Sequence, residues 1–381
     1  MNVLRDSLRD ALTLVAKAVG SSSTLPILAC VDLDADGGNL TLTTNNFEMV
    51  IRTRITAQAR DPFSAAVPAA VLVDIVSASD ADTINLNFDQ ASQTMNVVSG
   101  GAKSKIKALS HDEFPLVPDA ETLLGKLPAH TLKNAIKRVV IAASSDMARP
   151  ALNGVQLAKL GKDVYLAAAD GFRLAAYRLE TPLEFPEKRP SLVIPRQAAV
   201  KLSQILPDDD QMVSLCLSKN GSAILFTWQT TYVWAILLDA AFPDWQQIVP
   251  AGFKYTLNLP GKETFAALHR ADVFAREANH VVRFKPGEEG GLVIEGTSDE
   301  TGKSETVLDV VMPFQIAFNG VFAKQGIEAI GADAVHLHLN MGNAPIMFTN
   351  GSDRYIYILM PMVDTSAVAA QASAALQSEP A

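Results

Sequence analysis

The chain has 381 residues, of which 48% are hydrophobic and 19% are charged, and its formal net charge is −9 at pH 7. At roughly 150 residues per domain, this length predicts two or three domains, each able to bury a core. The acidic balance argues against holding nucleic acid by bulk charge. No apolar run approaches the roughly 18 residues of a membrane helix, and Met1–Asp6 lacks signal-peptide character, so we predict a cytoplasmic protein without a membrane partner.

The N-terminal part of the chain predicts two helices and a set of short strands. Apolar residues recur at helical spacing from Leu4 to Val19, and Gly20 with the serines after it ends that helix. Val67-Pro68 introduces a second helix over residues 69–76, and Phe114-Pro115 closes the unit. The strands are expected near residues 30–33, 40–43, 49–51, 84–88, 95–98 and 103–109.

The same order of elements recurs in the middle of the chain. A helix is predicted through Leu132–Val140, followed by strands around residues 152–157, 164–168 and 174–179. Ile194-Pro195 stands 127 residues after Val67-Pro68 and introduces a helix through Leu206. Phe242-Pro243 stands 128 residues after Phe114-Pro115. Spacings this long indicate duplicated domains and exclude a solenoid of short repeats.

A third copy begins at Pro260 and ends at Met362, again with two helices among short strands. The Ala/Ser/Gln-rich sequence after Met362 is typical of a disordered tail. We therefore predict an α+β fold of three tandem copies, in which two helices cover one face of antiparallel sheets. The predicted boundaries are 1–119, 120–250 and 251–362, with a tail at 363–381.

Catalytic and metal-binding patterns are near misses. Gly302-Lys303-Ser304 resembles the end of a phosphate-binding loop, but Thr297 stands where the loop requires glycine, so an exposed turn is favoured. His336 and His338 could ligate a metal but have no third ligand at a telling spacing, and Asp208-Asp209-Asp210 fits a solvated loop after a helix. Cys30 and Cys216 form no Cys-x-x-Cys pair and are expected to be small buried side chains. We predict no catalytic site, metal or cofactor.

An Asp-Gly turn lies near the middle of the chain, at Asp170-Gly171-Phe172-Arg173-Leu174, between two apolar runs. A hairpin is the plain interpretation of this pattern. Together with Thr24–Leu28, Leu152-Asn153-Gly154, Phe242-Pro243-Asp244 and Met360-Pro361-Met362, in this order and with the threefold repeat, it resembles the beta subunit of bacterial DNA polymerase III, the sliding clamp. The resemblance covers residues 1–362.

The resemblance implies a head-to-tail dimer of three-domain chains that closes into a six-domain ring around double-stranded DNA, without sequence preference. Such a ring is a non-catalytic processivity factor of the polymerase holoenzyme, and its partners are the catalytic subunit, the clamp loader and other proteins with a clamp-binding motif. The alternative from another class is a clamp-like interaction scaffold that no longer encircles DNA. Topology holds a ring on DNA, so a weakly basic lining suffices. The candidate DNA contacts, some of which could equally be solvating charges, are Lys133, Lys137, Arg138, Arg149, Arg196 and Lys201.

The resemblance also implies a pocket that takes a short extended peptide carrying a glutamine and two apolar side chains. We expect the Arg173 stem to floor this pocket while its guanidinium stays in water. Core packing is the competing interpretation for Leu152, Leu174 and Ile358. The candidate residues are Leu152, Ala169, Asp170, Gly171, Phe172, Arg173, Leu174, Pro243, Gln247, Ile248, Ile358, Met360, Pro361 and Met362.

The sequence departs from the family pattern at several of these positions, which marks a divergent or accessory clamp. Ala169 and Phe172 replace a threonine and a histidine, and Gln247 stands where arginine is common. These changes should shift the preferred peptide towards apolar anchors. In the first copy, Ser22 and Ala69-Ala70 stand where basic residues are frequent, which implies weaker DNA contact there. We also hypothesise that the tail at 363–381 shades the pocket.

Overall fold

The structure is a computed structural model, and it describes residues 1–20, 25–58 and 62–362. Ser22 and the tail at 363–381 therefore lie outside the described residues. The chain divides into two compact units. Among the described residues, the first comprises Met1–Ile136, Leu157–Lys162 and Thr181–Ala240, and the second comprises Lys137–Gln156, Asp163–Glu180 and residues 241–362.

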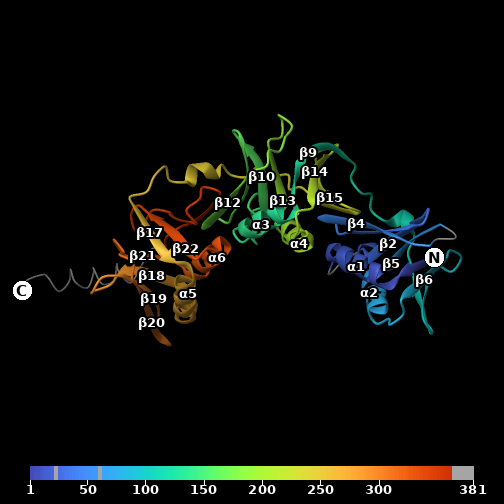
Figure 1. Cartoon of the computed structure of the whole chain (residues 1–381), viewed down its shortest axis with the longest axis horizontal. Coiled ribbons are helices and arrows are strands. Elements are labelled where there is room, and N and C mark those ends of the chain that lie inside the picture. Colours follow the sequence, from blue (N-terminus) through green and yellow to red (C-terminus); the bar gives the residue numbers. More distant parts are fainter. Residues whose placement is uncertain (21–24, 59–61, 363–381) are drawn as a thin grey trace, which may run out of the picture. The chain divides into compact units, whose positions relative to one another are not determined.

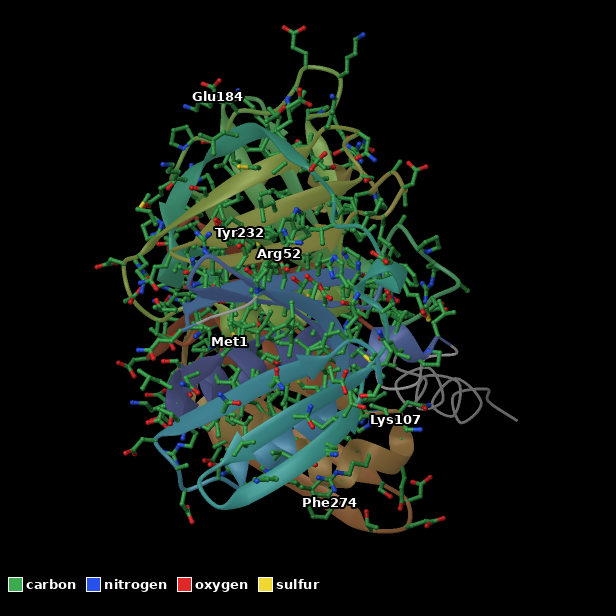
Figure 2. The ribbon with its side chains drawn as sticks, turned by 90° about the vertical axis from the view of Figure 1, so that its right-hand side faces the viewer. Met1, Arg52, Lys107, Glu184, Tyr232 and Phe274 are labelled. Atoms are coloured by element: carbon green, nitrogen blue, oxygen red, sulfur yellow. The ribbon has the colours of Figure 1, made fainter. Side chains whose placement is uncertain are left out.

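The first unit contains an antiparallel sheet that joins the first two predicted repeats, in the order β5-β2-β3-β4-β16-β15-β14-β9. The repeats meet where β4 pairs with β16, which places Arg52 opposite Tyr232 (Figure 2). We call this pairing the first joint. The strands are β2 (Cys30–Asp36), β3 (Asn39–Asn45), β4 (Met49–Thr56), β5 (Phe63–Pro68), β9 (Ala120–Pro128), β14 (Met212–Ser218), β15 (Ala223–Trp228) and β16 (Thr231–Ile236).

A second antiparallel sheet of the first unit has the order β1-β6-β7-β8. Helix α1 packs against α2 and β4, and it buries Leu8, Leu12 and Val15 at the helical spacing read from the sequence (Figure 1). The sheet consists of β1 (Asn2–Leu4), β6 (Thr83–Asp89), β7 (Thr94–Ser99) and β8 (Ala102–Lys107). The helices are α1 (Arg5–Val15), α2 (Ala69–Ser77), α3 (Ala129–Val140), which continues into the second unit, and α4 (Arg196–Ile205), with 3₁₀ turns η1 (Ala16–Ala18), η2 (Pro26–Ala29) and η3 (His111–Glu113).

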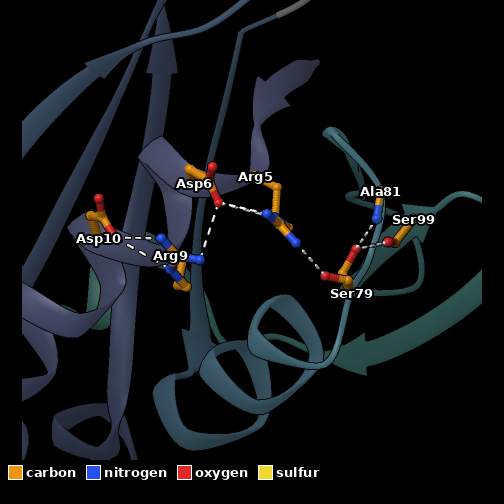
Figure 3. Close-up of polar contacts among 7 residues, drawn as sticks. All are labelled: Arg5, Asp6, Arg9, Asp10, Ser79, Ala81 and Ser99. Carbon is orange, nitrogen blue, oxygen red and sulfur yellow. Dashed lines mark hydrogen bonds and ion pairs between the residues drawn. The ribbon is translucent and has the colours of Figure 1, made fainter.

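The start of α1 is tied to the loop that follows α2 (Figure 3). The Arg5 Nη1 donates to the carbonyl oxygen of Ser79 at 2.9 Å, and the Ser79 hydroxyl bonds the hydroxyl of Ser99 and accepts from the backbone N–H of Ala81. The sequence placed Leu4 on the helix, and this is wrong. Leu4 ends strand β1, pairs with Thr83 and is 61% exposed. The prediction failed because helical spacing alone does not reveal that a residue pairs with a distant strand.

The second unit joins the second and third repeats in the same way, through an antiparallel order β11-β12-β24-β23-β22-β17. Here β12 pairs with β24, and we call this pairing the second joint. These strands are β11 (Asp163–Ala169), β12 (Arg173–Leu179), β17 (Tyr255–Pro260), β22 (Ala334–Leu339), β23 (Ile346–Thr349) and β24 (Tyr355–Leu359). Strand β10 (Gly154–Leu160) runs from the second unit into the first, which also contains β13 (Ser191–Pro195).

The other sheet of the second unit has the order β20-β19-β18-β21 and is covered by α5, which packs against α6 (Figure 1). Asn319 caps α6, because its side-chain oxygen accepts from the N–H of Phe322 at 3.1 Å. The Gly302-Lys303-Ser304 segment was expected to be a turn, but Gly302 begins β20 and pairs with Ser298. The elements are β18 (Val281–Pro286), β19 (Leu292–Ser298), β20 (Gly302–Leu308), β21 (Ile316–Asn319), α5 (Gly261–Ala275), α6 (Gly320–Ile330), η4 (Trp245–Ile248) and η5 (Arg276–Ala278).

Each repeat thus carries two α-helices and antiparallel sheets, as the sequence predicted for an α+β fold. The repeat boundaries at 119 and 250 remain predictions. Within residues 1–20, 25–58 and 62–362, every helix is too short or too polar to cross a bilayer.

Candidate partner-binding site

The turn between β11 and β12 is held by the side chain of Asp170. Its Oδ1 accepts from the backbone N–H groups of Phe172 and Arg173 at 2.9 and 3.0 Å. Gly171 has φ +93°, a conformation that glycine adopts without strain. The hairpin interpretation is therefore confirmed, and the turn leaves 59% of the surface of Phe172 exposed.

Arg173 lies beneath this turn, and its guanidinium is buried. The side chain is only 9% exposed, and Nε donates to Asp170 Oδ2 at 3.0 Å. The guanidinium carbon lies 4.0 Å from the ring centroid of Phe322, and Nη1 bonds the side chains of Gln325 and Tyr357. The prediction that the Arg173 guanidinium stays in water is thus wrong. A guanidinium has five N–H donors, and the partners just described supply the contacts that its burial requires. Burial raises the pKa of the neighbouring Tyr357 to about 12.

The second joint brings Phe172 beside the end of β24. The backbone N–H of Met360 donates to the carbonyl oxygen of Phe172 at 2.8 Å, just beyond the Leu174–Ile358 pair. Leu174 and Ile358 are buried at 2% and 1%, so they support the site from the core. The exposed apolar side chains are Phe172, Met360 (38%) and, in the segment after β16, Ile248 (43%). Ala169 is buried, Leu152, Pro361 and Met362 are half-buried, and Pro243 and Gln247 are exposed.

Arg149 contacts the Asp170 turn of the candidate partner site. Its Nη1 donates to the carbonyl oxygen of Asp170 at 3.3 Å, and its Nε donates to Asp146 at 3.0 Å. The N–H of Leu152 in turn donates to the carbonyl oxygen of Arg149, which ties the two residues to one loop. The role of Arg149 as a DNA contact stays a prediction, and its hydrogen bond to Asp170 could not be inferred from sequence spacing.

Trp245 anchors the segment that carries Pro243, Gln247 and Ile248. Its Nε1 donates to Gln156 Oε1 at 3.0 Å, and its ring meets that of Tyr165 edge-on with centroids 5.5 Å apart. The indole is 4% exposed. Sequence reasoning missed this residue, although a tryptophan two positions after Phe242-Pro243 was a signal of an anchor.

The remaining candidate DNA contacts differ in exposure and in whether the basic group already has a partner within the chain. Lys137 is exposed, and Arg196 and Lys201 on α4 are half-buried. Lys133 is buried and its Nζ lies 2.7 Å from Asp208, so phosphate contact would require that ion pair to break. The guanidinium of Arg138 lies over the rings of Tyr177 and Tyr355 at 5.8 and 5.7 Å. Their roles at DNA stay predictions.

The described residues contain no cluster of three or more histidine, cysteine or acidic side chains that could hold a metal. His338 bonds the hydroxyls of Thr256 and Thr349, and burial lowers its pKa. Cys30 is buried as predicted, which raises the pKa of its thiol to about 11. Cys216 is half-buried, so the prediction of a buried side chain is wrong there, but the partial burial still raises the pKa of its thiol. A raised pKa disfavours the nucleophilic thiolate at both cysteines.

The fold and this site define a protein of three tandem clamp domains. Models of the N-terminal, central and C-terminal domains of the DNA polymerase III beta subunit match residues 1–118, 126–244 and 246–363. The chain belongs to the DNA polymerase III beta subunit family, whose function is that of a DNA sliding clamp. This match favours a clamp over the interaction scaffold.

Relatives agree over nearly the full length. The chain is 28% identical over 381 residues to the beta sliding clamp of Synechocystis sp., covering 94% of this chain and 97% of that one. The crystal structure of the sliding clamp from Pseudomonas aeruginosa with ligand is 25% identical, with a TM-score of 0.88, and covers 96% of this chain and 99% of that chain. The sliding clamp from Bartonella birtlesii bound to griselimycin is also 25% identical, with a TM-score of 0.89 and the same coverage.

Proposed function

We propose that this chain is a non-catalytic processivity clamp of the cytoplasmic replication machinery, which closes as a homodimer around double-stranded DNA. It would tether the polymerase, the clamp loader and other partner proteins through the site around Phe172. The observation that carries the tethering role is the second joint. There, a rigid turn held by Asp170 and Arg173 presents an exposed aromatic ring beside Met360. Rigid presentation of an apolar anchor lowers the entropy cost of peptide binding.

Ring closure is supported by two sheet edges that have no neighbouring strand within the described residues. Strand β8 ends the order β1-β6-β7-β8, and β20 ends the order β20-β19-β18-β21. The β8 edge exposes Lys103, Lys105 and Lys107. The β20 edge follows the exposed acidic turn Asp299-Glu300 and carries Val307, which is 65% exposed. Strand β20 itself carries one lysine and one glutamate, Lys303 and Glu305, so the acidic charge lies in the turn beside it. Pairing the lysine-bearing edge of one copy with the β20 edge of a second copy would cover both edges and close a head-to-tail dimer.

Light scattering combined with loading onto nicked circular DNA tests this proposal. We expect a mass of twice 40.7 kDa and retention on circular DNA but not on short linear DNA. Lys103→Glu combined with Lys105→Glu should shift the protein towards monomer, because the new carboxylates would lie near the acidic Asp299-Glu300 turn of the second copy across the dimer interface. Lys162→Glu, in the exposed turn before β11, is the matched control and should remain dimeric. A wild-type monomer at micromolar concentration would overturn the ring.

A further inference from the structure

The two joints of this chain are built alike, each within its own unit. At the second joint the N–H of Met360 donates to the carbonyl oxygen of Phe172 at 2.8 Å, and at the first joint the N–H of Ile236 donates to that of Glu48 at 2.9 Å. Val50 pairs with Trp234 at the first joint as Leu174 pairs with Ile358 at the second. Corresponding residues of the paired strands therefore stand 124 positions apart along the chain.

This correspondence shows a difference between the joints: an indole of the chain itself fills the second joint, and no indole fills the corresponding place at the first. At the second joint, Trp245 occupies a seat formed by Gln156 and Tyr165. The residues 124 positions earlier are Asp32 and Thr41, and counting from the Phe-Pro pairs puts Val117 in the place of Trp245. The smaller side chain leaves an open cleft of about 700 Å³, lined in part by Asp32, Thr41 and Val117.

The floor of this cleft is aromatic. The rings of Tyr232 and Trp234 stack with centroids 6.0 Å apart and an interplanar angle of 20°, and the guanidinium of Arg52 lies 5.6 Å over the Trp234 ring. Leu225 adds an aliphatic wall. Such a floor favours contact with a flat, apolar ring.

The wall of the cleft supplies a hydrogen-bond acceptor. Asp32 is 5% exposed, and His111 Nδ1, 2.8 Å from Oδ1, is the one side-chain partner found for it among the described residues. Burial raises the pKa of Asp32 even though His111 lies beside it, which indicates a carboxyl group short of donors. At the second joint, Gln156 occupies this position and accepts from an indole N–H.

We propose that this first-joint cleft binds the indole of a tryptophan presented by an extended segment of a partner protein, with its N–H donated to Asp32. Of the three tryptophans, Trp234 forms the floor of the cleft, and Trp228 and Trp245 are buried elsewhere in the fold. The residues outside the described ranges include no aromatic residue, so we assign the occupant to another molecule. The inference rests on the proposed function only in naming a partner protein as the source. The cleft would be a second docking site, separate from the one around Phe172.

Fluorine NMR with 5-fluoroindole as the probe, added to the full-length protein, tests the proposal. Wild type should show one saturable site. Val117→Trp copies the second joint and should weaken binding at least about tenfold, and Thr41→Tyr, which narrows the same cleft, should act in the same direction. Trp245→Val should open the seat at the second joint and add a second saturable site. Binding of 5-fluorobenzofuran, which lacks the N–H, should be about fivefold weaker or more.

Thermal unfolding first establishes that each variant is folded. Wild type that does not bind 5-fluoroindole, or Val117→Trp and Thr41→Tyr variants that both bind it as wild type does, would overturn the proposal. Equal binding of the two probes would overturn the role of Asp32. Peptide binding at Phe172 should be unchanged in Val117→Trp, so the cleft can fail while the proposed tethering function stands.

Discussion

Replacing Phe172 by alanine separates partner binding from stability. The ring is 59% exposed, so about 120 Å² of a roughly 200 Å² side chain is open to a peptide. If a partner covers half of that, at about 25 cal/mol per Å², the ring contributes about 1.5 kcal/mol to binding. Phe172→Ala should therefore raise the Kd of a peptide with one glutamine and two apolar side chains by about tenfold. The backbone bonds of residue 172 to Asp170 and Met360 remain, so the free energy of unfolding should change by less than about 0.5 kcal/mol.

Fluorescence anisotropy of the labelled peptide measures this effect, with thermal unfolding of the same samples alongside. Phe47 provides a matched control, because it lies in the turn between β3 and β4 and is 55% exposed. Phe47→Ala should leave the Kd unchanged. An unaltered Kd for Phe172→Ala, or an equal loss in both variants, would refute the assignment of the site.

Three further predictions address the support of this site, the His111 contact and the tail. Arg173→Ala should lower the free energy of unfolding by about 2–4 kcal/mol, because it leaves the largely buried carboxylate of Asp170 without its ion-pair partner. An unshifted thermal midpoint would contradict this. The pKa of His111 is raised by its bond to Asp32, so this contact stabilises the fold below the ordinary value of 6.5 and is lost as pH rises through the raised value. As pH rises from below 6.5 through the raised pKa, the free energy of unfolding of wild type should thus fall relative to that of His111→Gln, by less than about 1 kcal/mol because the ring is partly exposed. Unfolding of both proteins over this pH range measures the difference. Deleting residues 363–381 should tighten peptide binding at Phe172 if the tail shades it, and an unchanged Kd would dismiss that hypothesis.

The repeat of elements could be predicted from sequence because its signals are local. Helical spacing found α1, and the recurring Val67-Pro68 and Ile194-Pro195 marked the starts of α2 and α4. The burial of Arg173 could not be predicted, because Gln325 and Tyr357 lie 152 and 184 residues further along the chain. For such contacts, spacing carries no information: the register of β12 on β24 and the packing of α6 against β24 bring the groups together.

The residues predicted for the candidate site likewise fall into a set that the structure exposes and a set that it buries. Sequence resemblance pointed to Phe172, Met360 and Ile248, which the structure exposes, and also to Leu174 and Ile358, which it buries. A pattern of residue types cannot distinguish the two sets. Leu174 and Ile358 lie inside the paired strands, whereas Phe172 and Met360 lie just beyond the strand ends, and only the register of β12 on β24 fixes where the pairing stops.

The duplicated joint explains how one turn can be specialised without disturbing the fold. At both joints the closing hydrogen bond uses only backbone atoms, from Ile236 to Glu48 and from Met360 to Phe172. Backbone atoms are the same for every residue type, so the side chains of Glu48 and Phe172 are free to differ while the pairing stays closed. The Phe172 side chain is exposed at the second joint and does not pack in the core, whereas the neighbouring Arg173 side chain is buried. Partner preference should therefore change with residue 172 and stability with residue 173, although the two are adjacent in the chain.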